Sequence, residues 1–201
     1  VCKFLREDGT KLRPWDDPNE MDEYMVKSWN ERVRPNDKVY HLGDVVMHRK
    51  ALSILHRLNG DKVLIRGNHD IFKLEEYTQH FRDIRGYHVM NGMILSHIPV
   101  HIESLGRFGT NIHGHLHSGR VKVDNNIDTR YHCVCVEQTD FRPILFEDVI
   151  KKIEKEGGRK NTIFCFWWGT FGERIRRVLL GFGAFCNGRV WNDRGFSYYC
   201  L

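Results

Sequence analysis

Short apolar runs alternate with helix-like patterns along residues 1–158 of the sequence. Apolar residues recur at helical spacing after Asp17 and Pro18, a suitable N-cap and first helical residue, and this pattern predicts a helix over 20–33. Similar patterns predict helices over 49–58 and 147–156. Apolar runs that lead into polar turns predict strands in the segments 38–44, 62–70, 92–99, 109–117, 132–137 and 142–147. The alternation of strands and helices predicts an α/β protein.

Polar side chains stand at the ends of four of these predicted strands. They are Asp44, Asn68 with His69, His97, and His115 with His117. The carboxyl ends of strands gather at one edge of an α/β sheet, so these side chains are expected to lie close together. Neutral imidazole is the commonest protein ligand for transition metals. The pattern therefore predicts a metal site at this edge.

Four motifs in these turns carry a family resemblance: GDVV at 43–46, RGNHD at 66–70, SHIP at 96–99 and HGHLH at 113–117. In this order they resemble four of the five motifs of the calcineurin-like metallophosphoesterases, which run Asp-x-His, Gly-Asp, Gly-Asn-His-Asp/Glu, a single His and Gly-His-x-His. The resemblance covers about residues 1–155 and is nearest to the compact phage and bacterial branch. It implies a layered β-sandwich flanked by helices, in four layers of α/β/β/α.

The resemblance also implies a role for each motif residue. Asp44 would bridge two divalent metal ions, with manganese favoured over iron, zinc or nickel. Asn68, His97 and His115 would complete the ligand set of one ion, and His117 would be a ligand of the other. A metal-bound hydroxide would attack the phosphorus of a nucleotide or another phosphomonoester or phosphodiester. His69 would stabilise the phosphoryl charge or protonate the leaving oxygen, with Asp70 orienting it, and Arg66 and His101 are candidate substrate contacts.

Three further expectations concern the neighbours of these residues. The glycines before Asp44, Asn68 and His115 suggest turns that require a positive φ. His41 and His113 precede motif glycines and are candidate hydrogen-bond partners of the ligands. The remaining histidines are expected to be structural: His48, His56, His80, His88 and His132.

The sequence departs from the family pattern at its front, because no Asp-x-His tripeptide precedes Gly43. We expect the first strand and two ligands of the family to be missing, and activity to be reduced. A metal-binding or phosphate-binding module without catalysis is therefore an alternative to the enzyme.

Composition and charge limit the partners and the cell compartment that we expect for this protein. The net charge of +5 lies in residues 159–201, which hold seven basic and two acidic residues, so residues 1–158 are neutral and give no electrostatic argument for nucleic-acid binding. Six cysteines without a Cys-x-x-Cys pair fit a reducing, cytoplasmic compartment. Cys133 and Cys135 are expected to be small apolar residues on one face of a strand. No apolar run is long enough for a membrane-spanning helix.

The amino-acid composition changes near Gly158, which predicts a boundary between a domain over 1–158 and a basic, aromatic, glycine-rich tail over 159–201. Residues 171–185 have the composition of a short basic amphipathic helix, and Trp167, Trp168 and Phe171 suit a membrane interface. The four glycines between 169 and 183 weaken any helix and favour a disordered or loosely attached tail, with a packed extension of the domain or a membrane or partner anchor as alternatives. An adaptor that binds nucleic acid or membrane through this tail is a further alternative for the function. We expect the tail to contribute nothing to the metal site.

Overall fold

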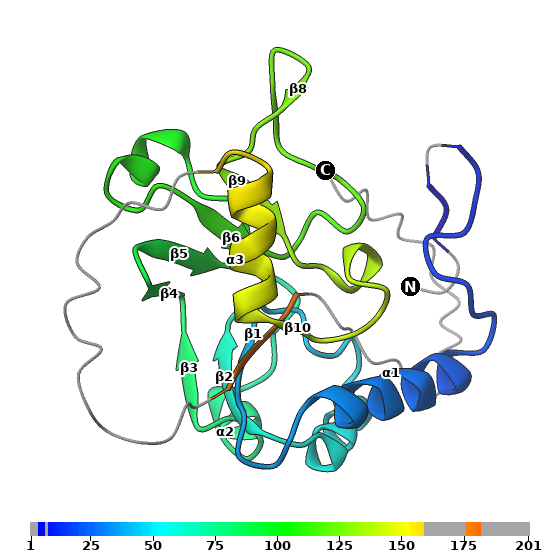
Figure 1. The fold of residues 1–201 in the computed structure, drawn as a ribbon. Coiled ribbons are helices and arrows are strands. Elements are labelled where there is room, and N and C mark those ends of the chain that lie inside the picture. Colours follow the sequence, from blue (N-terminus) through cyan, green and yellow to red (C-terminus); the bar gives the residue numbers. More distant parts are fainter. Residues whose placement is uncertain (1–3, 7, 159–175, 182–201) are drawn as a thin grey trace.

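The computed structural model describes residues 4–6, 8–158 and 176–181 (Figure 1). In this part of the chain the larger sheet has five strands in the order β10-β11-β1-β2-β3. The strands are β1 (Lys38–His41), β2 (Asp61–Ile65), β3 (Asp83–Arg85), β10 (Ile144–Leu145) and β11 (Arg177–Leu180). Parallel pairing joins β11 to β1, β1 to β2 and β2 to β3, whereas β10 pairs antiparallel with β11.

The second sheet has four strands in the order β4-β5-β6-β9. They are β4 (Tyr87–Met90), β5 (Met93–Ser96), β6 (Asn111–His113) and β9 (Tyr131–Cys133). The strands β5, β6 and β9 run parallel, and β4 forms an antiparallel edge. A separate small hairpin of β7 (Lys122–Val123) and β8 (Asn126–Ile127) projects from the body of the molecule (Figure 1).

Three α-helices and three 3₁₀ helices connect the strands of the described chain. They are α1 (Pro18–Arg32), η1 (Arg49–Arg57), α2 (Leu74–Tyr77), η2 (Ile102–Arg107), η3 (Val136–Gln138) and α3 (Phe146–Lys155). The Asp17 side chain caps α1 by accepting a hydrogen bond from the Asn19 N–H, as the sequence predicts. Residue Gly157, with φ of +79°, follows the end of α3, in the left-handed conformation that glycine adopts without strain.

Apolar side chains fill two main layers. One cluster packs α1 and η1 against the larger sheet and includes Met21, Trp29 and Leu55. A second lies between the two sheets, where Val63 and Ile65 of the first meet Leu95 and Ile112 of the second. The helix α3 adds buried residues to this second cluster and crosses in front of both sheets in Figure 1. The first cluster packs helices onto the larger sheet, and the second packs the two sheets onto each other. The strand ends of both sheets therefore keep fixed relative positions.

The structure confirms the α/β class and most of the predicted elements. The segment 49–58 is a 3₁₀ helix instead of an α-helix, and the strand predicted over 132–137 ends at Cys133. Cys133 and Cys135 are both buried, as expected, although Cys135 lies beyond the strand as the N-cap of η3. The sequence pattern missed the short strands β3, β4, β7 and β8, in part because exposed positions interrupt three of them.

The boundary predicted near Gly158 does not mark the end of the folded domain. Residues Arg177–Leu180 form β11 in the interior of the larger sheet, and the Leu42 N–H donates to the Leu180 carbonyl at 2.6 Å. This segment is a strand, so a helix over the whole of 171–185 is wrong. Three consecutive apolar residues here are buried, which suits an interior strand. The predicted interfacial residues Trp167, Trp168 and Phe171 lie outside the described residues.

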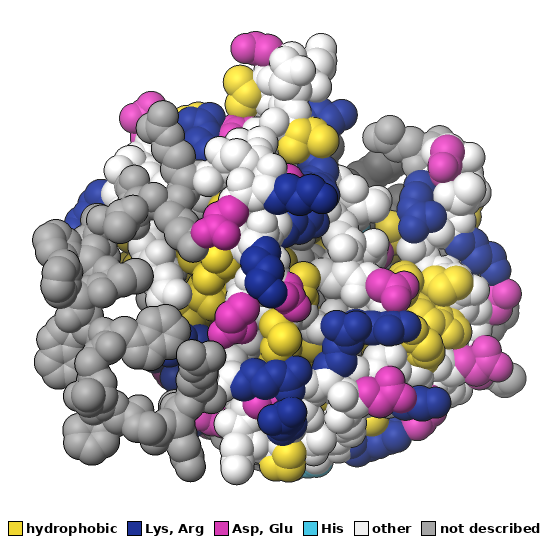
Figure 2. Space-filling model, viewed as in Figure 1, with side chains coloured by type: hydrophobic (Ala, Val, Ile, Leu, Met, Phe, Trp, Pro, Cys, Tyr) yellow, Lys and Arg dark blue, Asp and Glu magenta, His cyan; other side chains and the backbone are white. Residues whose placement is uncertain are grey.

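Acidic and basic side chains are interspersed on the face shown in Figure 2, in keeping with the neutral balance of residues 1–158. No helix among the described residues combines the length and the apolar character that crossing a membrane requires.

Candidate metal centre

Four strand-end turns bring their polar residues together at one edge of the two sheets. Asp44 follows β1 and Asn68 follows β2, while His97 and His115 follow β5 and β6 of the second sheet. Within the described chain, Asp44, His97 and His115 form one group whose ligand atoms all lie within 4.8 Å of one another. Segments separated by up to 71 positions in the sequence thus meet at a single point.

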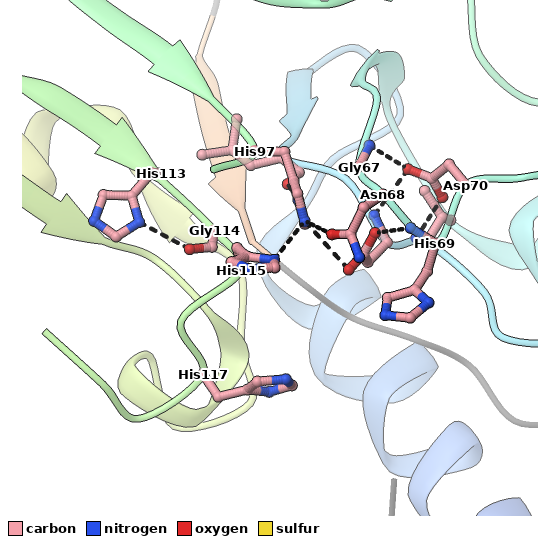
Figure 3. A network of polar contacts seen from close by, with 12 residues as sticks. Gly67, Asn68, His69, Asp70, His97, His113, Gly114, His115 and His117 are labelled. Atoms are coloured by element: carbon pink, nitrogen blue, oxygen red, sulfur yellow. Dashed lines mark hydrogen bonds and ion pairs between the residues drawn. The ribbon is translucent and has the colours of Figure 1, made fainter. Parts of the chain in front are cut away.

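The Nε2 atom of His97 lies at the centre of this group (Figure 3). It is 2.9 Å from Asn68 Oδ1, 3.2 Å from Asp44 Oδ2 and 3.2 Å from His115 Nδ1. Carboxylate, amide and imidazole donors are the set that divalent transition metals accept. The arrangement therefore has the donor chemistry of a cation site.

Backbone contacts set the orientation of the His97 ring. Its Nδ1 lies 2.7 Å from the Leu42 carbonyl, so Nδ1–H donates to that oxygen and Nε2 is the ring atom that faces Asn68, Asp44 and His115. Asp44 is fixed in a similar way, because its Oδ1 accepts a hydrogen bond of 2.8 Å from the His69 N–H. Both side chains are almost fully buried. Hydrogen bonds to the backbone thus hold both side chains in position.

Asp70 holds two of the turns together. Its Oδ2 accepts the N–H groups of Asp44 and Gly67, each at 2.8 Å, and its Oδ1 accepts the Val45 N–H at 2.9 Å. Sequence reasoning gave this carboxylate the task of orienting His69, but it binds backbone instead, and the His69 ring points away from it (Figure 3). Asp70 therefore fixes the spacing between Asp44 and the Asn68 turn.

The turn glycines are required for two different reasons. Gly43 has φ of +86°, as the sequence suggests. At Gly67 and Gly114 the reason is space, because a Cβ would come within 2.6 Å of the Asp44 nitrogen and 2.9 Å of the Leu42 carbonyl oxygen, respectively. The left-handed conformation falls instead on Asp44 and His115 themselves, at φ of 54° and 65°. Non-glycine residues in this region are strained, and such strain concentrates at functional sites.

His117 lies apart from the Asp44 group and has its own buried support (Figure 3). Its Nδ1 is 3.1 Å from Glu137 Oε1, and the same oxygen accepts a 2.9 Å hydrogen bond from Arg13 Nε. The side chains of Arg13 and Glu137 are fully buried. Sequence reasoning missed this pair, because an isolated Arg and an isolated Glu 124 positions apart carry no local signal. Together they fix the orientation of the His117 ring.

The other predicted residues occupy different positions. Arg66 is exposed beside Asn68, and its Nε donates to the Asp70 carbonyl at 2.8 Å. His101 caps η2 by accepting the Glu103 N–H. His113 supports the turn before His115 through a 2.8 Å contact with the Gly114 carbonyl. The five histidines expected to be structural contribute to none of the contacts around His97: His48, His56, His80, His88 and His132.

Burial and charge act in opposite directions on the central pair. Burial lowers the pKa of His97, but the hydrogen bond and charge of Asp44 outweigh it, so the pKa is raised overall. Burial likewise raises the pKa of Asp44, and His97 with the His69 N–H reverses this effect to give a lowered pKa. For His115, burial and the neighbouring His97 both lower the pKa. Asp44 is thus held as a carboxylate and His115 as a neutral base, the forms that bind a metal.

His41 was a candidate partner of the ligands, and it has a different position. Its ring lies between Trp29 and Phe81, and neither ring nitrogen has a hydrogen-bond partner among the described residues. Burial lowers its pKa to about 3. The folded protein therefore keeps His41 neutral at a pH where the unfolded chain is protonated.

This burial predicts a loss of stability in acid. The stabilisation is complete above pH 6.5, where His41 is neutral in both states, and it is lost as the pH falls from 6.5 towards 3 because the unfolded chain alone gains the proton. Between pH 7 and pH 5 this amounts to about 2 kcal/mol. Urea unfolding at both pH values should show that His41→Phe removes this part of the pH dependence. The exposed His48→Gln is the control, and an unchanged dependence in His41→Phe would contradict the assignment.

Comparison with known proteins places the chain in a family. No family model matches the sequence. The chain is 35% identical over 151 residues to the uncharacterized protein MJ1445 of Methanocaldococcus jannaschii, an alignment that covers 71% of this chain and 81% of that protein. The chain belongs to the same family as MJ1445. It is also similar to the crystal structure of AQ665, a protein of unknown function from Aquifex aeolicus, with a TM-score of 0.53 and 25% identity over 66% of this chain and 84% of that one.

Proposed function

We propose that this protein is a divalent-metal-dependent phosphoester hydrolase of the calcineurin-like type, with helices outside two packed sheets. The observation that carries the proposal is the convergence of Asp44, Asn68 and His115 on His97 Nε2, each within 3.2 Å and each from a different strand-end turn. The order of the four motifs supports the same conclusion.

The residues present fit a divalent ion. They offer one carboxylate, one amide oxygen and two imidazoles, and the acceptor-rich surroundings of His97 Nε2 favour a positive charge at this point. A bound divalent ion supplies Lewis acidity, which withdraws charge from a phosphoryl oxygen and makes water a better nucleophile. A second ion beside His117 and Asp44, with manganese as the favoured metal, is part of the proposal.

Other side chains would act on the substrate directly. The His69 ring follows the Asn68 turn, while its backbone N–H fixes Asp44, so the imidazole is left to donate a proton to the leaving oxygen. Arg66 is held through its Nε, and its exposed guanidinium provides positive charge for a phosphoryl oxygen. In this proposal the buried Asp44 and His97 hold the metal, and the more exposed Arg66 and His69 meet the ester.

The test is hydrolysis of para-nitrophenyl phosphate and its bis-ester by the full chain, with and without Mn²⁺, together with calorimetric titration of the metal. We expect metal-dependent release of nitrophenol that chelation abolishes. If Mn²⁺ binds at the centre and neither ester is hydrolysed, the catalytic proposal is wrong and the chain is a metal-binding module.

His69→Ala should separate proton transfer from metal binding. A positioned acid contributes about 10²-fold to 10⁴-fold to the rate, and we expect a decrease of that size. Metal content should be unchanged, because the ring is absent from the contacts around His97 Nε2. Metal analysis and steady-state kinetics measure the two effects on one sample. Loss of metal in the variant would make His69 a ligand instead.

A further inference from the structure

A pocket of about 430 Å³ opens beside the candidate metal centre, with Asn68 and His97 in its wall. Pockets of this size hold small organic ligands. Its other lining residues come mainly from the β4–β5 region and the loop that follows: Gly86, Tyr87, Ile94, Ser96, Ile98 and Val100, with Arg66 and Gly67 from the turn after β2. The pocket is thus continuous with the site of the proposed reaction.

The polar atoms of Ser96 and Val100 in the second-sheet wall are used within the protein. Ser96 Oγ donates to the Ile98 carbonyl at 2.6 Å and accepts from Asn111 Nδ2 at 2.9 Å. The Val100 N–H donates to Asn111 Oδ1 at 3.0 Å, and its carbonyl accepts the Tyr131 hydroxyl at 2.9 Å. Asn111 is fully buried. These bonds fix the loop and leave apolar side chains as the free surface of this wall.

Two of those side chains are unusually exposed for their type. Tyr87 is 60% exposed and Ile98 is 54% exposed. Arg66 contributes a positive charge to the same lining, which also holds Asn68 and His97. A ligand that complements this pocket therefore combines an anionic group with an apolar group. A rigid wall also favours binding, because little ordering is needed when the ligand arrives.

We propose that this pocket binds an aromatic ring of the phosphoester, with the ring against Tyr87 and Ile98 and the phosphoryl group at Asn68 and His97. The inference rests on the proposed function for the identity of the anionic group. Aromatic rings pair favourably with a tyrosine ring beyond the gain from burial alone. Small alkyl phosphates and free sugar phosphates would leave the apolar wall in water, so they should be poorer ligands.

The experiment measures binding without turnover, by calorimetry on the full chain in the presence of Mn²⁺. Phenylphosphonate and thymidine 5′-phosphonate carry a ring, directly or beyond a sugar, and methylphosphonate carries none. We expect at least one ring-bearing ligand to bind about tenfold more tightly than methylphosphonate. Tyr87→Ala and Ile98→Thr should remove most of this preference while leaving methylphosphonate affinity unchanged. If phenylphosphonate loses more affinity in these variants, the pocket fits an aryl ester. If thymidine 5′-phosphonate loses more, it fits a nucleotide.

Val89→Ala provides the matched control, since Val89 is 42% exposed on the same strand as Tyr87 and does not line the pocket. Its ligand preference should equal that of the wild type. Equal affinity of all three ligands in the wild type would overturn the inference, even in a protein that hydrolyses phosphoesters. A ring preference that survives both pocket variants would also overturn it. Conversely, absence of metal-dependent hydrolysis with a Tyr87-dependent ring preference would reject the proposed reaction and retain the pocket.

Discussion

Asp44→Asn should reduce metal-dependent hydrolysis to the background rate. Within the group of Asp44, Asn68, His97 and His115 the Asp44 carboxylate carries the one formal negative charge, so the substitution leaves a divalent ion facing neutral donors. We expect Mn²⁺ affinity to fall by more than about 100-fold, beyond the effect usual for groups that only support a ligand. The fold should persist, because an asparagine Oδ1 can still accept the His69 N–H.

Calorimetric titration with Mn²⁺ and ester hydrolysis measure both effects, and thermal unfolding of the variant without metal checks the fold. Asp124→Asn, in the exposed turn of the β7–β8 hairpin, is the control for loss of one negative charge. Wild-type metal affinity in Asp44→Asn would remove this residue from the proposed centre.

The second large effect is expected on stability. Asp70→Asn replaces one carboxylate oxygen by an NH₂ group, which cannot accept any of the three backbone N–H groups that the carboxylate binds. At least one buried donor loses its partner, and the charge that strengthens the other bonds is lost as well. We expect a decrease of about 3 kcal/mol in the free energy of unfolding. For a chain of this length that corresponds to a melting temperature lower by about 6–12 °C.

Thermal and urea unfolding of the metal-free protein measure this effect directly. Asp140→Asn is the matched control, because the Asp140 side chain is 78% exposed and pairs only at the surface with Arg142. A melting temperature within a degree of the wild type for Asp70→Asn would show that the three hydrogen bonds of the Asp70 carboxylate are not needed for stability. Because Asp70 also sets the spacing of two turns, weaker Mn²⁺ binding should accompany the loss of stability.

The sequence by itself determined the α/β class and the set of polar residues at strand ends. Periodicity located α1, and apolar runs located β1, β2, β5 and β6, because these elements bury a continuous face. The prediction that Asp44, Asn68, His97 and His115 meet rested on one rule, that parallel strands present their carboxyl ends at a common edge. The rule accounts for each pair within its own sheet, and the packing of the two sheets brings the pairs together. Local sequence was sufficient wherever the determining interactions are local.

Only the tertiary structure decided which partner each side chain has. Asp70 stood next to His69 in the sequence, yet its carboxylate binds backbone 25 and 26 positions away. Glu137 and Arg13 support His117, and β11 pairs with β1. Both contacts join segments that are far apart in the sequence, and no periodic pattern predicts such contacts. Pattern reasoning also placed positive φ at the three turn glycines, but of these only Gly43 has it, whereas Gly67 and Gly114 are required for space and Asp44 and His115 are themselves left-handed. These outcomes depend on how two sheets pack, and packing is a property of distant contacts that no short stretch of sequence encodes.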